Sequence, residues 1–124
     1  IGDKAHYNSF TNNRLLGVTG KSELVYSNHS YDTCNVFTNN VFTNGIRGIN
    51  MLRGYNLVVS GNEFINQTEK AISLTYYWYP EILSNYIHSD TRLSSAIYFD
   101  DCRDQVKINT NQIILPFGGS GVRL

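Results

Sequence analysis

The segment VVSGNEF (residues 58–64) decides the fold, because its pattern recurs along the chain. It reads apolar-x-x-Asn-x-apolar, with Val59 and Phe64 on either side of Asn62. Four other segments repeat this pattern: residues 10–15, 37–42, 82–87 and 108–113. The five Asn residues stand at positions 13, 40, 62, 85 and 111, so successive copies are 22 to 27 residues apart.

A second pattern, small-apolar-x-apolar, lies between copies of the first. It occurs as GINM (48–51), AISL (71–74), AIYF (96–99) and GVRL (121–124). Its apolar positions Ile49, Ile72, Ile97 and Val122 are separated by 23, 25 and 25 residues. We place Leu24 of ELVY in the same column, 25 residues before Ile49. Two patterns that alternate at this period predict a solenoid in which each repeat forms one coil.

Each repeat carries three short apolar segments, which predict three β-strands per coil. One coil cannot bury its apolar face alone, whereas stacked coils share a core and pair their strands in parallel. The recurring Asn residues then fall in register at the short turn between the second and third strands. There we expect each side-chain amide to bond the turns above and below it. A leucine-rich repeat has a similar period but needs more leucine and a helical return segment, and a β-sandwich would not require the Asn to recur.

On these motifs, residues 10–124 resemble the right-handed parallel β-helix family, also called pectate-lyase-like. The family includes polygalacturonases and phage tailspikes that cut bacterial surface polysaccharides. The resemblance implies an all-β, single-stranded right-handed parallel β-helix (solenoid) of about five coils with an Asn ladder at the short turn. INTNQ (108–112) has Asn where a polygalacturonase has a catalytic Asp, and no Gly-His-Gly occurs. The chain is therefore most similar to a tailspike depolymerase.

The tailspike resemblance implies a protein that binds and cleaves a bacterial surface or other complex polysaccharide. It also implies a homotrimer in an extracellular or virion-surface location. A polysaccharide lyase or epimerase of the same fold is one alternative. A non-catalytic β-helical shaft or adhesin segment is the other.

Composition and charge limit the other classes of partner. Ten Lys and Arg residues balance ten Asp and Glu residues, so no nucleic-acid partner is expected. No apolar run approaches about 18 residues, so no membrane insertion is expected. The length predicts a single β-helix domain over residues 1–124. Because no polar cap follows GVRL, we expect a fragment of a longer protein.

Metal binding is not predicted from the sequence. Cys34 and Cys102 are expected to be unpaired, buried thiols, and His6, His29 and His88 lack the spacing of metal ligands. A hydrolase of this fold would need no cofactor, whereas a lyase would need a divalent cation such as calcium.

A polar and aromatic surface on the first strands is the predicted binding site. Sugars present hydroxyl groups to planar polar side chains and C–H faces to aromatic rings. The predicted substrate-binding residues are Asn50, Arg53, Ser73, Tyr76, Tyr77, Trp78, Tyr79 and Tyr98. Since a strand buries about half of its side chains, several rings of TYYWYP (75–80) should be exposed. A subunit interface, inward packing and an ordinary solvated face are the alternatives.

The predicted catalytic residues are carboxylates near the end of one first strand. They are Glu69, Asp100, Asp101 and Asp104. Glycoside hydrolysis needs one protonated and one ionised carboxylate, about 5–10 Å apart. In the lyase alternative, these carboxylates would instead hold the cation. The simpler alternative is a solvated turn in which Asp104 pairs with Arg103 or Lys107.

Overall fold

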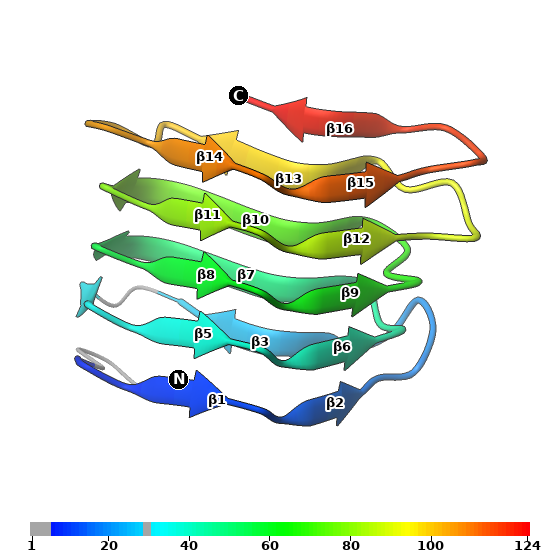
Figure 1. Ribbon diagram of the computed structural model, residues 1–124, viewed down its shortest axis with the longest axis horizontal. Coiled ribbons are helices and arrows are strands. Elements are labelled where there is room, and N and C mark those ends of the chain that lie inside the picture. Colours follow the sequence, from blue (N-terminus) through cyan, green and yellow to red (C-terminus); the bar gives the residue numbers. More distant parts are fainter. Residues whose placement is uncertain (1–5, 29–30) are drawn as a thin grey trace.

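The computed structural model describes residues 6–28 and 31–124 as a β-solenoid of stacked coils. In Figure 1 the near strands run from left to right and the far strand of each coil returns from right to left while the chain climbs. The coil is therefore right-handed. Within the described residues no helix is long and apolar enough to cross a membrane.

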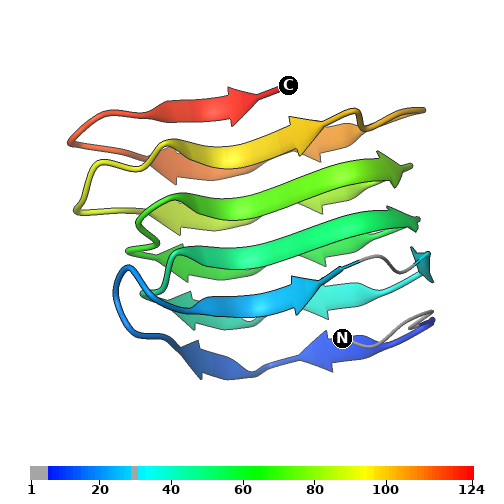
Figure 2. The same cartoon turned by 180° about the vertical axis from the view of Figure 1, so that it is seen from behind.

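Every coil contributes one strand to each of three parallel sheets. The first sheet is the far layer in Figure 1 and faces the viewer in Figure 2. Its strands are β3 (Glu23–Ser27), β7 (Arg47–Tyr55), β10 (Lys70–Trp78), β13 (Ser95–Asp100) and β16 (Ser120–Arg123), and β4 (Asp32–Thr33) pairs with the end of β7.

The second and third sheets consist of three-residue strands. The second sheet contains β1 (Ser9–Thr11), β5 (Val36–Thr38), β8 (Val58–Ser60), β11 (Glu81–Leu83) and β14 (Lys107–Asn109). The third sheet contains β2 (Arg14–Leu16), β6 (Val41–Thr43), β9 (Glu63–Ile65), β12 (Tyr86–His88) and β15 (Gln112–Ile114).

The strand pairing confirms the columns predicted from the repeat. Val59 pairs with Phe37 and Ile82 in the second sheet. In the same way, Phe64 pairs with Phe42 and Ile87 in the third sheet. Each column thus places apolar side chains of successive coils above one another. The predicted all-β parallel solenoid is correct.

The placement of Leu24 was wrong by one residue. Ile49 pairs with Val25, and Leu24 takes the place that Gly48 occupies in the next coil. The larger side chain fits because glycines surround it: a Cβ atom on Gly17 would lie 2.7 Å from Leu24 Cδ2. Gly45 is also close, since its Cβ would lie 3.5 Å from Leu24 Cγ.

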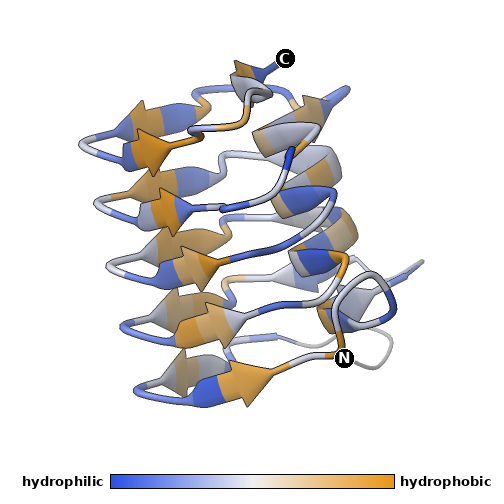
Figure 3. Cartoon of the chain, turned by 90° about the vertical axis from the view of Figure 1, so that its right-hand side faces the viewer, coloured by the Kyte–Doolittle hydropathy of each residue, from blue (hydrophilic) through white to orange (hydrophobic). Residues whose placement is uncertain are grey.

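The core is a set of apolar columns that run along the solenoid axis. Figure 3 shows apolar positions recurring at the same places in successive coils. The rings of Phe10 and Phe37 are stacked with centroids 4.8 Å apart, and those of Phe42 and Phe64 are 4.7 Å apart. Full burial of such a side chain stabilises the fold by about 1.5–3 kcal/mol. The stacked columns therefore hold the coils together.

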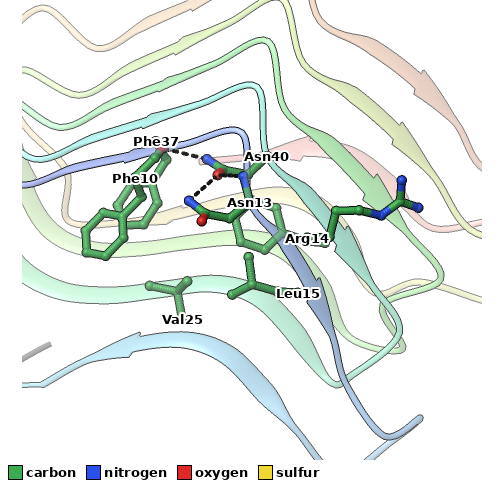
Figure 4. Close-up of a pocket in the computed structure, with 8 residues that line it drawn as sticks. Phe10, Asn13, Arg14, Leu15, Val25, Phe37 and Asn40 are labelled. Atoms are coloured by element: carbon green, nitrogen blue, oxygen red, sulfur yellow. Dashed lines mark hydrogen bonds between the residues drawn. The ribbon is translucent and has the colours of Figure 1, made fainter.

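The predicted Asn ladder is confirmed. Asn62 donates from its backbone N–H and from Nδ2 to Asn85 Oδ1, at 2.9 and 3.1 Å. It also donates from Nδ2 to the Phe37 carbonyl at 2.8 Å, and its own Oδ1 accepts the Asn40 N–H at 2.9 Å. The same bonds link Asn13 to Asn40 and Asn85 to Asn111. Figure 4 shows the first of these steps beside the stacked rings of Phe10 and Phe37.

Candidate functional site

A groove crosses the outer face of the first sheet. Its central row consists of Tyr26, Asn50, Ser73 and Tyr98, in register on four successive strands, and Arg123 continues the row on β16 outside the groove. The groove has a volume of about 430 Å³ and is lined by Glu23, Tyr26, Arg47, Asn50, Leu52, Lys70, Ser73, Thr75, Tyr98 and Asp100. We call it the first-sheet groove.

Polar residues form the floor of the first-sheet groove. Asn50 and Ser73 point away from the core, yet they are only 6% and 4% exposed. Asn50 Nδ2 donates a hydrogen bond to Glu23 Oε1 at 3.0 Å. Long charged side chains beside them therefore cover the two residues.

The walls of the groove are charged and hold one another in place. Arg47 forms ion pairs with Glu23 and with Glu69, so it bridges carboxylates from two different coils. The Lys70 ammonium lies 4.1 Å from the centre of the Tyr98 ring, a cation–π contact. Among the described residues Lys70 has no carboxylate within ion-pair distance. The groove thus combines a guanidinium paired with two carboxylates and an ammonium group that contacts an aromatic ring.

The first-sheet strands bend at the far end of the groove. Arg53 and Tyr76 lie at the bend with positive φ angles of 63° and 55°, and Asp101 follows in the next coil at 48°. Beyond the bend Tyr55 pairs with Trp78, and their rings are stacked with centroids 4.9 Å apart.

The bend carries a second pocket on the surface. It has a volume of about 270 Å³ and is lined by Tyr31, Arg53, Tyr76 and Trp78. We refer to these four residues together with Tyr55 as the bend patch. Three of the four residues that line this pocket are aromatic, whereas the first-sheet groove, which ends directly before it, is lined mainly by polar and charged residues.

The aromatic segment predicted to bind sugar is divided by the structure. Tyr76 and Trp78 share the bend patch, whereas Tyr79 lines a separate pocket with Asn56, Val58, Glu81, Gln105 and Lys107. Tyr77 is only 1% exposed, so its prediction as a surface contact was wrong. Its ring packs against Gly54, where a Cβ would lie 2.5 Å from the Tyr77 hydroxyl. Burial of that hydroxyl raises the pKa of Tyr77 far above its usual value.

The structure does not bring the four predicted catalytic carboxylates into one groove. Asp100 lines the first-sheet groove, while Glu69 is paired with Arg47. Asp101 turns away at the bend and accepts hydrogen bonds from Arg103 Nε and Nη2 at 2.9 and 3.1 Å. These bonds lower the pKa of Asp101.

The ion pairs near Asp104 differ from those predicted for a solvated turn at this place. Asp104 is exposed, and the predicted pair between it and Arg103 or Lys107 does not form. Arg103 pairs with Asp101 instead, and Lys107 with Glu81. The acidic segment after β13 is therefore a solvated turn with a local ion pair.

Sequence reasoning missed much of the groove wall. Glu23, Arg47 and Lys70 are partners in register, each two residues before the apolar residue of its column. The repeat contained this signal for Arg47 and Lys70. For Glu23 and Tyr26 the repeat is misleading, because Leu24 and Val25 are both apolar and only Val25 pairs with Ile49.

The residues that could bind a soft or borderline metal are dispersed. His6 Nδ1 lies 2.8 Å from Thr33 Oγ1, and His88 pairs with Asp90 on the third sheet. Met51 is fully buried in the core. Burial also raises the pKa of the Cys102 thiol, which disfavours the thiolate that binds metals. Within residues 6–28 and 31–124 no group of three or more His, Cys, Asp and Glu could hold a metal ion, and His29 lies outside these residues.

Comparison with known proteins supplies a family. No curated protein and no solved structure matches the chain. One family model does match, over residues 1–124, and its description reads "Periplasmic copper-binding protein (NosD)". Copper in proteins is bound by His, Cys and Met, and the described residues do not bring such donors together. The dispersal of these donors does not alter the family match. Because that match covers the whole chain, the chain belongs to the NosD family.

Proposed function

We propose that this chain is a periplasmic glycan-binding β-helix that holds a polysaccharide along the first-sheet groove without cleaving it. The observation that carries this proposal is the row of polar and aromatic residues in register on five strands of one sheet face. A regular row at the spacing of parallel strands offers repeated contacts to a repeating polymer. The periplasmic location follows the family description.

The chemistry of the groove suits sugar hydroxyl groups. Thr75 and Asp100 supply donors and acceptors in the groove, above the covered polar floor of Asn50 and Ser73. Tyr26 is 41% exposed at one end of the row and offers a ring face to the C–H side of a pyranose. Arg47 is already paired with two carboxylates, so it does not need a charged group of the ligand as a partner.

Binding is favoured over hydrolysis by the positions of the carboxylates. A hydrolase flanks the scissile bond with two of them, one protonated and one ionised. Glu23 and Asp100 both line the groove, but Glu23 is already bonded to Arg47 and Asn50. Glu69, Asp101 and Asp104 are not among the residues that line it. The tailspike activity, the homotrimer and the virion surface stay predictions of the resemblance, and the family match favours the periplasm.

Calorimetric titration with a panel of bacterial surface oligosaccharides tests the proposal. We expect Asp100→Ala and Tyr26→Ala each to weaken binding about tenfold, because each removes a direct contact with the sugar. Glu81→Ala and Tyr86→Ala are matched controls on the second and third sheets and should leave affinity unchanged. Equal losses in the controls would contradict the assignment to the groove.

The same samples distinguish the alternative functions. Release of new reducing ends that stops with Asp100→Asn would restore the hydrolase hypothesis. Release that stops with a chelator would indicate a cation-dependent lyase. If the wild-type chain binds no member of the panel, the non-catalytic shaft is the better description.

A further inference from the structure

The bend patch places bulky side chains where the backbone disfavours them. Elsewhere in the chain positive φ angles fall on Asn or Gly at many turns, as at Asn39, Gly61 and Asn66, and also on other residues such as Cys34, Tyr79 and Thr110. These residues adopt the left-handed region at low cost, whereas Arg and Tyr do so rarely. Strain of this kind persists mainly where the side chain has a function. Arg53 and Tyr76 combine this strain with a shared place in the lining of a surface pocket.

The patch gathers several aromatic rings in one place. Tyr55 and Trp78 are stacked at an interplanar angle of 16°, so each ring covers one face of the other. Tyr76 and Tyr31 are 41% and 54% exposed beside them. Aromatic surfaces of this kind, apolar at the ring and polar at the hydroxyl, suit ligands with both characters.

The guanidinium of Arg53 gives the patch a positive charge. Its Cζ lies 5.8 Å from the centre of the Tyr76 ring, and among the described residues no carboxylate lies within ion-pair distance of it. The acidic residue of the same row, Asp101, is already bonded to Arg103. A planar guanidinium binds a carboxylate through two parallel hydrogen bonds.

We propose that the bend patch binds the carboxylate-bearing residue of an acidic glycan, a hexuronate. In this arrangement Arg53 pairs with the sugar carboxylate while the rings of Tyr76 and Trp78 contact the pyranose. The patch continues the first-sheet groove, since Leu52 and Thr75 of the groove directly precede Arg53 and Tyr76. The inference rests on the proposed function and specifies its substrate class as acidic polysaccharide.

The single tryptophan of the chain makes the test direct, because Trp78 belongs to the patch. Its fluorescence is titrated with an oligohexuronate and with the same oligosaccharide after reduction of its carboxylates to alcohols. We expect a change of Trp78 emission with both ligands and about tenfold tighter binding of the acidic one. Arg53→Gln should remove this preference and leave the affinity for the reduced ligand unchanged.

Arg92→Gln is the matched control, because it removes another exposed cation in the loop between β12 and β13. Equal loss of acidic-ligand affinity in both variants would show general charge attraction and overturn the proposal. If the reduced ligand binds as tightly as the acidic one, the proposal fails while the glycan-binding function stands. If neither ligand binds the wild-type chain but neutral glycans bind in the calorimetric panel, only the acidic substrate class is excluded. If nothing binds in either experiment, both proposals fail.

Discussion

Asn62 satisfies several backbone groups with one side chain. Its amide donates to the Phe37 carbonyl and to Asn85 Oδ1, and it accepts the Asn40 N–H. All of these groups are buried at a corner that water does not reach. The recurring Asn is therefore a structural element of the corner and lies on a different sheet edge from the proposed binding face.

Asn62→Ala should lower the free energy of unfolding by about 2–4 kcal/mol, because several buried donors and acceptors lose their partner. Urea unfolding followed by circular dichroism measures this change. Asn109→Ala, which replaces an exposed Asn on β14, should change it by less than about 0.5 kcal/mol. Equal effects of the two substitutions would contradict the structural role of the ladder, and loss of glycan affinity with Asn62→Ala in the folded protein would assign it a second role.

Tyr77 buries a hydroxyl group that has no hydrogen-bond partner among the described residues. Tyr77→Phe removes that hydroxyl, so we expect unchanged or slightly higher stability at pH 7. In the unfolded chain Tyr77 titrates near pH 10, whereas burial raises its pKa in the folded chain. As the pH rises, the Tyr77 hydroxyl therefore loses its proton in the unfolded chain first. The contribution of the neutral hydroxyl to the free energy of unfolding is complete below pH 10 and falls as the pH rises above 10.

Urea unfolding of wild type and Tyr77→Phe between pH 8 and pH 11 tests this titration. Above pH 10 the wild type should lose up to about 1.4 kcal/mol per pH unit more than the variant. The contributions of the other tyrosines and of the lysines to the pH dependence cancel in this comparison, because both proteins share them. Parallel pH profiles would show that the Tyr77 hydroxyl reaches water.

At the scale of elements, the bend in β7 and β10 separates two surfaces with different chemistry. Before the bend the strands present the polar first-sheet groove, and after it they present stacked rings. The bend depends on a left-handed residue at Arg53 and Tyr76. A substitution there changes the backbone energy and the bend patch together.

Tyr76→Asn should keep or raise the melting temperature, because Asn adopts a positive φ more readily than Tyr. The increase in the free energy of unfolding should not exceed about 1 kcal/mol. The same change removes a ring from the bend patch and should weaken hexuronate binding as read by Trp78 fluorescence. A large loss of stability would show that the Tyr76 ring supports the fold, and an unchanged affinity would remove Tyr76 from the proposed site.

The strand columns could be predicted from the sequence because spacing alone fixes them. Every second and third strand pairs as expected, with the apolar residues on either side of each Asn in register. In ELVY two adjacent apolar residues compete for one column. The choice of Val25 over Leu24 depends on the room that Gly17 and Gly45 leave around Leu24, which is a three-dimensional property.

The candidate site could be predicted only in part, because one backbone angle decides where its side chains point. Simple alternation of strand residues describes the row of Asn50, Ser73 and Tyr98 correctly. At Asp101 strand alternation alone would point the side chain to the core, whereas the positive φ turns the chain and leaves the carboxylate exposed beside Arg103. No sequence pattern marked that turn, because Arg53 and Tyr76 at the equivalent positions are not typical turn residues.

At the scale of the whole molecule, coils in the middle are supported from both sides. The middle residues of β5, β8 and β11 are buried, whereas those of β1 and β14 are only half-buried. In a solenoid each coil contacts only its neighbours, so stability is a sum of local terms. Opening of an outer coil therefore disrupts fewer contacts than opening of a central coil.

Hydrogen exchange of the 124-residue chain, followed by mass spectrometry, should show this gradient. Amides of β8, β9 and β10 should exchange most slowly, and those of β1, β2 and β15 at least tenfold faster, which corresponds to about 1.4 kcal/mol of local stability. The slow amides should also become faster in Asn62→Ala, whose side chain links the central coils. Uniform exchange along the chain would instead indicate one cooperative unit.

The Asn ladder also gives the solenoid an electrical direction. At each step a side-chain carbonyl accepts the hydrogen bonds of the coil before it: this holds for Asn40, Asn62, Asn85 and Asn111. The four carbonyl dipoles therefore point the same way and add along the axis, as peptide dipoles do in a helix. Their negative ends face β1. A surface that extends the ladder must match this polarity, so two such molecules can continue it head to tail but not head to head.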